Sequence, residues 1–144
     1  MIAELGRRGR GERESGAFLL SPRGDRGTVT RVVYLDDLDP ACLVGSIHLR
    51  AAAYGKLWSL CDREGLCVAG DVHTHPGPGV CQSSLDQDNP MVARVGHLAL
   101  ILPNLAMGPI QPREVGVHEY LGEAGWRSSF GRRAARLIYV GRWA

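Results

Sequence analysis

The sequence has no segment suited to a membrane or to export. None of its apolar runs approaches the roughly 20 residues that a membrane-spanning helix needs. Residues 1–13 are rich in arginine and glycine and contain no apolar stretch like that of a secretory signal. We therefore expect a cytoplasmic protein with no membrane partner.

The cysteines form no C-x-x-C pair, although the chain contains Cys42, Cys61, Cys67 and Cys81. This absence argues against a thiolate zinc site and against a dithiol redox centre. With 144 residues, 44% of them hydrophobic, the chain is able to build its own core without disulfides. We expect four reduced thiols.

Lysine is also scarce, because Lys56 is the only one and arginine fills every other Lys or Arg position. The arginines gather near the two ends, in residues 7–13 and 132–136. Such clusters are able to contact nucleic acid, but no aromatic residues alternate with them and no nucleic-acid-binding motif accompanies them. We interpret both clusters as solvated termini and expect no nucleic-acid partner.

The chain length suits a single domain, which we expect to span residues 1–144 with a core from about 14 to 130. Short apolar or β-branched runs, separated by turn residues, predict its strands. The predicted strands cover residues 16–21, 28–35, 66–72, 97–102, 115–121 and 126–129.

Helical spacing of apolar residues predicts one long helix over about residues 49–63, with Gly65 at its C-cap. A short helix is predicted from Ser83, and Asn89-Pro90 is typical of another helix start. Residues 132–140 fit either a helix or a strand. Loops are expected over residues 36–45 and 104–113. The order of elements indicates an α/β layer fold, with a mixed β-sheet flanked by helices.

Two histidines directly follow the predicted strand 66–72. His73 and His75 are two residues apart, so in a strand both imidazoles point to one side while Thr74 faces the other. Pro76 is unable to continue the ladder and turns the chain outward. By itself, H-x-H has ordinary explanations, because a surface pair or two core histidines give the same spacing.

A third ligand candidate follows this turn. Ser83 and Asp86 are three residues apart, which places them on one face of a helical turn. Two histidines and one carboxylate leave a fourth tetrahedral position for water, as in catalytic zinc sites. The full string His73-x-His75-Pro76-x6-Ser83-x2-Asp86 is far more restrictive than H-x-H. It predicts a zinc ion bound by His73, His75 and Asp86.

The string resembles the signature of the JAMM (MPN+, JAB-domain) zinc metallopeptidases, which remove ubiquitin-like proteins from their targets. That family places a glutamate at the start of an early strand, and Glu14 matches it, ahead of the apolar run 16–20. The stretches 88–91, 96–97 and 116–120 resemble bacterial members associated with ubiquitin-like conjugation systems. The resemblance covers about residues 14–126.

This resemblance implies a JAB/MPN-like fold and a peptidase that cleaves after the C-terminal glycine of a ubiquitin-like protein. It implies conjugates of that protein as substrates, with E1-like and E2-like proteins of the same system as further partners. Family members usually carry a substantial helix before the glutamate, whereas only 13 residues precede Glu14. We therefore expect a truncated or poorly ordered first element.

The resemblance also assigns catalytic roles. Zinc lowers the pKa of its water towards roughly 7. Glu14 would take the water's proton and deliver it to the leaving amine, and Ser83 would share the oxyanion with the metal. Glu12 is an alternative base, and Ser83 is alternatively a helix N-cap or serves in both ways.

Other side chains near the motif keep open roles. Asp71 and Asp88 either orient a metal-binding histidine or remain solvated carboxylates. We interpret His97 and His118 as packed or surface histidines rather than ligands. Cys81 lies in the loop between the ligands, but a thiol mechanism needs a histidine held beside the sulfur.

Two other functions remain open. A catalytically silent MPN scaffold would share the fold, although the chain keeps all four residues of the expected site. A zinc amidase or peptidase acting on small substrates would share the site. The pocket over the metal distinguishes this last function, because a glycine tail needs only a narrow channel.

Overall fold

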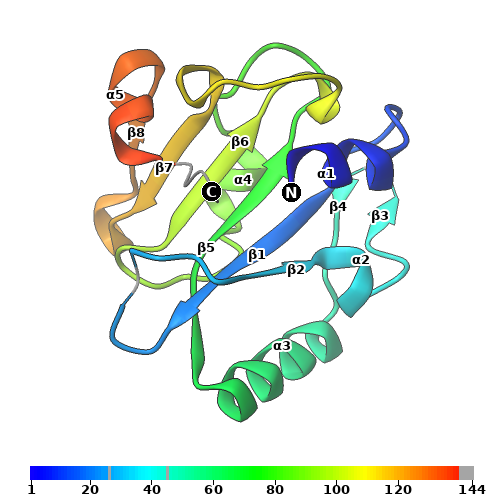
Figure 1. Ribbon diagram of the computed structural model, residues 1–144, viewed down its shortest axis with the longest axis vertical. Helices are drawn as coiled ribbons and strands as arrows, with labels where there is room; N and C mark the ends of the chain where they lie inside the picture. The colour runs from blue at the N-terminus through cyan, green and yellow to red at the C-terminus, as the bar shows by residue number, and fades with distance from the viewer. Residues whose placement is uncertain (26, 45, 140–144) are drawn as a thin grey trace, which may run out of the picture.

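A six-stranded mixed sheet forms the centre of the protein in the computed structural model, which describes residues 1–25, 27–44 and 46–139 (Figure 1). Its strands are β1 (Gly16–Pro22), β2 (Arg31–Tyr34), β5 (Leu66–Thr74), β6 (Leu98–Leu102), β7 (Gly116–Tyr120) and β8 (Trp126–Ser129). They lie in the order β2-β1-β5-β6-β7-β8, with β5 and β6 parallel and the other neighbours antiparallel. The two short strands β3 (Leu43–Val44) and β4 (Ser46–Ile47) pair with each other.

Helices flank this sheet, which confirms the predicted α/β fold with a mixed sheet. They are α1 (Ile2–Gly9), α2 (Leu35–Leu38), α3 (Ala51–Glu64), α4 (Ser84–Asp88) and α5 (Gly131–Leu137). Single 3₁₀ turns are η1 (Asn104–Ala106), η2 (Pro112–Glu114) and η3 (Gly122–Ala124). None of the helices in the described ranges is long and apolar enough to cross a membrane.

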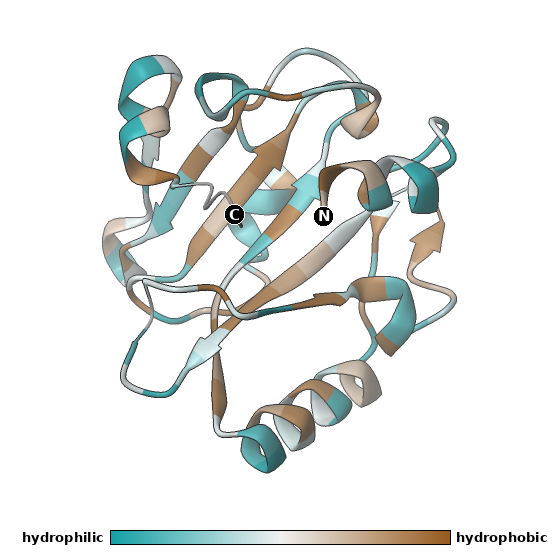
Figure 2. Ribbon diagram, in the orientation of Figure 1, coloured by the Kyte–Doolittle hydropathy of each residue, from teal (hydrophilic) through white to brown (hydrophobic). Residues whose placement is uncertain are grey.

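The core has two layers because β1 is buried on both faces. Phe18 and Leu20 pack with α2 and α3, whereas Ala17 and Leu19 pack with α1, η1 and α5. This division follows from the alternation of side chains along a strand. Figure 2 shows apolar residues along the central strands and a mixture of apolar and polar residues along α3.

The predicted strands and the long helix are confirmed, and the helix ends at Gly65 with a left-handed φ of 66°. Three local predictions were wrong or incomplete. The expected loop 36–45 overlaps α2, and 104–113 contains two 3₁₀ turns. No helix begins at Asn89-Pro90; the chain bends at Met91 and Val92, which pack against the core. The undecided segment forms α5, and position 140 lies outside the described residues.

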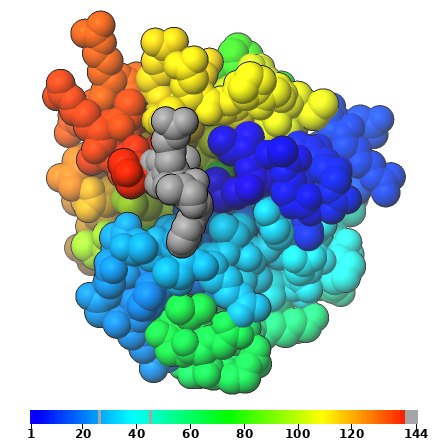
Figure 3. Space-filling model, viewed as in Figure 1, coloured from blue at the N-terminus to red at the C-terminus, as the bar shows by residue number. Residues whose placement is uncertain are grey.

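The first element departs most from the sequence analysis, because α1 is an ordered, packed helix. Leu5 is fully buried, and a Cβ on Gly6 would lie 2.8 Å from the Ala106 carbonyl oxygen. Figure 3 shows this dark-blue segment lying against the yellow segment that contains η1. Arg8 donates hydrogen bonds to Asp36 and Asp37 at 2.6 and 2.7 Å. Tertiary packing therefore outweighs the poor helix propensity of a glycine-rich stretch.

We predict that Leu5→Ala lowers the free energy of unfolding by about 2–5 kcal/mol, the usual cost of a large-to-small substitution in a core. Urea titration followed by circular dichroism measures this change. Leu137→Ala is the matched control, since Leu137 also lies in a short helix but is 60% exposed, and its effect should stay within about 0.5 kcal/mol. Equal, small effects would mean that α1 is not packed as described.

Candidate metal centre

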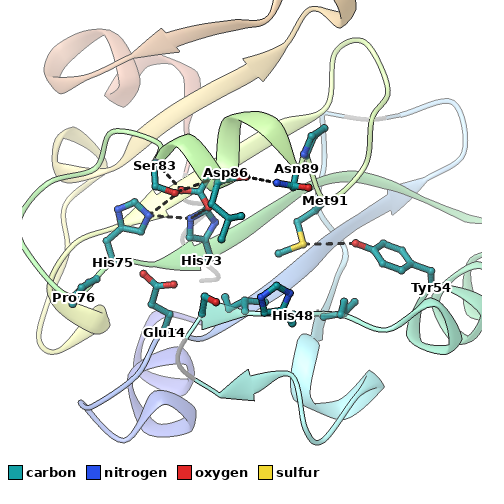
Figure 4. Close-up of a pocket in the computed structure, with 15 residues that line it drawn as sticks. Glu14, His48, Tyr54, His73, His75, Pro76, Ser83, Asp86, Asn89 and Met91 are labelled. Atoms are coloured by element: carbon teal, nitrogen blue, oxygen red, sulfur yellow. Dashed lines mark hydrogen bonds and ion pairs between the residues drawn. The ribbon is translucent and has the colours of Figure 1, made fainter.

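Three side chains from two segments converge beyond the end of β5. The Nε2 atoms of His73 and His75 lie 3.2 Å apart. Asp86 places Oδ1 3.6 Å from Nε2 of His73 and Oδ2 3.4 Å from Nε2 of His75. Figure 4 shows the two imidazoles and the carboxylate turned toward one point. Within the described residues, this is the cluster whose ligand atoms all lie within 4.8 Å of one another.

The spacing of this cluster fits a tetrahedral zinc ion. Two ligand atoms at zinc distances are separated by about 3.3 Å across a tetrahedral angle, close to the separations given above. Electrostatics favour a cation at the same point. Burial lowers the pKa of His73, but Asp71 and Asp86 outweigh it and raise that pKa to about 9. Burial raises the pKa of Asp86, while His73, His75 and Ser83 lower it far more.

Thr74, the residue between the two histidines, is hydrogen-bonded to Ser15, which directly precedes β1. The Thr74 amide donates to the Ser15 carbonyl oxygen at 3.0 Å. In return, the Ser15 amide donates to the Thr74 hydroxyl oxygen at 3.0 Å. The Ser15 hydroxyl donates to the Leu5 carbonyl oxygen in α1 at 2.8 Å. The missed helix therefore supports the site, and Glu14, one residue before Ser15, is held beside the histidines.

Glu14 lines the same cavity as the three ligand candidates, and its carboxylate faces the histidines (Figure 4). Burial raises the pKa of Glu14, the nearby Asp86 adds to this, and the two histidines oppose it. The alternative base, Glu12, is exposed and is not among the residues that line the cavity. Of the two glutamates, the structure brings only Glu14 into the cavity.

Ser83 is the N-cap of α4 and also lines the cavity. Its hydroxyl donates to Oδ2 of Asp86 at 2.7 Å and accepts from the Asp86 amide at 3.2 Å. The Ser83 amide donates to the same carboxylate oxygen at 2.8 Å. This capping box satisfies backbone donors at the helix start and fixes the direction of the Asp86 carboxylate.

The loop before α4 is hydrogen-bonded to His118 in β7, and this buried histidine is a packed residue, as expected. Its Nε2 donates to the Val80 carbonyl oxygen at 2.9 Å, and its Nδ1 lies 2.8 Å from the Ser128 hydroxyl. Burial lowers the pKa of His118, in keeping with a neutral imidazole. Gly116 permits the close approach, because a Cβ there would lie 2.1 Å from the Val80 oxygen.

Asp71 connects His73 to the other packed histidine, His97. Asp71 Oδ1 lies 2.6 Å from Nε2 of the fully buried His97. Its Oδ2 lies 3.7 Å from Nδ1 of His73, which is ion-pair distance but too long for a hydrogen bond. Burial raises the pKa of Asp71, but the two histidines outweigh this and lower it. Asp88 and Cys81 are exposed, and neither lines the cavity.

The backbone of His75 is fixed by the turn η1. Its amide donates to the Leu102 carbonyl oxygen at 2.9 Å, and its carbonyl oxygen accepts from the Leu105 amide at 2.8 Å. Asn104, Leu105 and Ala106 have φ values of 53°, 52° and 56°. Such left-handed conformations are costly for residues with a Cβ and often occur at functional sites. Only Asn104 signalled this turn in the sequence.

The cavity that contains these groups has a volume of about 650 Å³. Besides the expected site residues, it is lined by apolar side chains that sequence reasoning did not connect with the site. These include Ile47, Leu49, Tyr54, Leu85 and Met91. Tyr54 belongs to the predicted long helix and Met91 to the wrongly predicted one, so periodicity gave no sign that they meet.

Comparison with known proteins supports the fold and assigns no family. No known family model matches the chain. The fold is similar to the solution structure of protein DSY2949 from Desulfitobacterium hafniense, a structural-genomics target, with a TM-score of 0.58 and 20% sequence identity. The match covers 90% of this chain and 85% of that one. At this identity the likeness concerns the fold alone.

We predict that the protein binds one zinc ion per chain. His73→Ala or Asp86→Ala should abolish binding, because the two remaining protein ligands hold zinc too weakly. Elemental analysis after zinc reconstitution and desalting measures the metal content. His48→Ala is the control, since His48 lines the same cavity but lies outside the ligand cluster. Wild-type protein without zinc would contradict the metal centre.

We further predict that Thr74→Val lowers the free energy of unfolding by about 1–3 kcal/mol, because it leaves the buried Ser15 amide without its acceptor. Thr74→Ser keeps the hydroxyl and should restore most of the loss. Denaturation curves of the two variants measure the difference, and hydrogen exchange at the Ser15 amide should be faster in the valine variant. Equal exchange in both would contradict the hydrogen bond between Ser15 and Thr74.

Proposed function

We propose that this protein is a JAMM-type zinc metallopeptidase that cleaves after the C-terminal glycine of a ubiquitin-like protein, in conjugates, in precursors or in both. The convergence of His73, His75 and Asp86 beside Glu14 in one cavity carries this proposal. These are the residues on which the sequence resembles the JAMM family. A silent scaffold has no need to keep all four of them in contact with one cavity.

The mechanism follows from the placement of the side chains. A bound zinc ion would supply Lewis acidity and lower the pKa of a water molecule towards roughly 7. Glu14 then holds and moves the proton, first from the water and later to the leaving amine. Its pKa is raised by burial, which brings the carboxylate closer to the range of an effective general base. Ser83 lines the same cavity, and its single hydroxyl proton is donated to Asp86 in this structure. Turning this proton to a substrate oxygen would let Ser83 share the oxyanion with the metal.

Two supporting points concern the setting of the activity. All four cysteines are free thiols, as a reducing compartment requires, and we propose the cytoplasm as the location. We propose E1-like and E2-like proteins of the same conjugation system as partners, together with the ubiquitin-like protein itself. The partners extend the resemblance seen in the sequence.

A second candidate is a zinc amidase or peptidase for small substrates. The cavity volume of about 650 Å³ favours it, because this value lies within the range of small-molecule sites. A linear fusion of a ubiquitin-like protein to a short extension separates the two candidates when compared with an unstructured peptide of the same cleavage sequence. Efficient cleavage of the peptide alone would favour the small-substrate enzyme.

We predict that Glu14→Gln binds zinc normally yet loses turnover of the fusion by a factor of about 10²–10⁴, the usual contribution of a general base. Zinc content and initial cleavage rates are measured on the same preparations. Glu12→Gln is the matched control and should retain wild-type turnover, since its side chain is exposed outside the cavity.

The opposite result for the two glutamines would overturn the placement of the base. A thiol mechanism is tested in the same assay, because Cys81→Ser should keep turnover within a few-fold and a zinc chelator should abolish it. Loss of activity in Cys81→Ser with resistance to the chelator would replace the metallopeptidase proposal.

A further inference from the structure

The cavity at the metal centre has two chemically different ends. At one end lie Glu14, His73 and His75, with Ser83 and Asp86 beside them. At the other end lie Tyr54 and Met91, on the far side of His73 from Glu14 (Figure 4). The metal end therefore accounts for only part of the cavity volume.

The side chains that line the apolar end are held in place by packing against the core. The Tyr54 hydroxyl lies 3.8 Å from Sδ of Met91, and the Tyr54 ring packs edge-on against Phe18 with centroids 6.1 Å apart. Ile47 and Leu49 are partly buried against the same core cluster while they line the cavity. Burial, with Asp71 as a smaller cause, raises the pKa of Tyr54, so its hydroxyl stays neutral.

Charge is concentrated away from this end. Among the lining residues that the structure describes, the ionisable acids and imidazoles are Glu14, His48, His73, His75 and Asp86. All but His48 belong to the metal centre or adjoin it, and His48 is exposed. The buried carboxylate nearest Tyr54 is Asp71, but it does not line this cavity and is already paired with His97 and His73. A charged substrate side chain would therefore lose its hydration without gaining a free partner, whereas an apolar side chain would gain by moving out of water.

The position of Glu14 sets the direction in which a substrate lies. The base returns its proton to the leaving amine, so the amine belongs at the Glu14 end of the cavity. The acyl side then runs the other way, toward Tyr54 and Met91. Glycine at the cleavage position has no side chain, so the preceding residue is the first able to fill the apolar end.

We propose that this apolar end is a specificity subsite that takes a large aliphatic side chain from the residue just before the terminal glycine. This inference rests on the proposed peptidase function for the direction of the chain. The preferred tail then ends in an apolar residue followed by glycine, and a tail ending in two glycines leaves the subsite to water.

The experiment compares two metal-binding probes on the zinc-reconstituted full chain by isothermal titration calorimetry. Leucyl-glycine hydroxamate should bind about tenfold tighter than glycyl-glycine hydroxamate, or better, as expected for burying a leucine side chain. Met91→Asp should abolish this ratio by placing a charge in the subsite, while Met91→Leu should retain it. Zinc content and thermal stability of both variants show whether the fold and the metal centre are intact.

A metal-free readout separates this inference from the proposed function. N-acetyl-leucyl-glycine, but not N-acetyl-diglycine, should shift the methyl resonance of Met91 in the zinc-free protein. Equal binding of the two hydroxamates, or no selective shift of Met91, overturns the subsite. A leucine preference without cleavage of any ubiquitin-like fusion keeps the subsite and overturns the proposed substrate class instead.

Discussion

The pairing of Ser15 with Thr74 is the contact on which the geometry of the site depends. It joins the strand that begins after Glu14 to the residue between the two histidines. The β1–β5 register places Gly16 opposite His73, and a slip of one residue would turn every side chain to the other face. Gly16 permits this register, because a Cβ there would lie 2.9 Å from the Val72 carbonyl oxygen.

Other hydrogen bonds fix the two parts of the site that Ser15 and Thr74 do not contact, namely His75 and the loop that leads into α4. His75 is fixed through the left-handed turn η1, and the loop before α4 is fixed through His118. The indole of Trp126 donates to the Gln87 carbonyl oxygen at 3.1 Å, which anchors α4 itself. The ligand candidates thus come from short segments whose positions are set by neighbouring strands, a rigid arrangement that suits a site with demanding geometry.

The sequence predicted the parts of this arrangement that depend on the regular spacing of side chains along one strand or one helix. Alternation placed His73 and His75 on one side of a strand, and helical spacing placed Ser83 and Asp86 together. It failed where tertiary contacts decide. The glycine-rich α1 is helical because Leu5 is buried, and Asn89-Pro90 starts no helix because Met91 packs on the core. The apolar end of the cavity was invisible for the same reason, since Tyr54 and Met91 meet only in the folded chain.

Charge balance links these parts to chemistry. Two carboxylates, Asp71 and Asp86, flank His73, and Asp71 is almost completely buried. A proton on His73 compensates only one of them, whereas a divalent cation with neutral imidazoles balances both, and buried charges are stable only when they are balanced. Glu14 stands at the edge of this group, where burial raises its pKa, the two histidines lower it and Asp86 raises it slightly. Positive charge at the histidines therefore works against proton uptake by Glu14, and the burial of Glu14 is what keeps its carboxylate able to take up a proton.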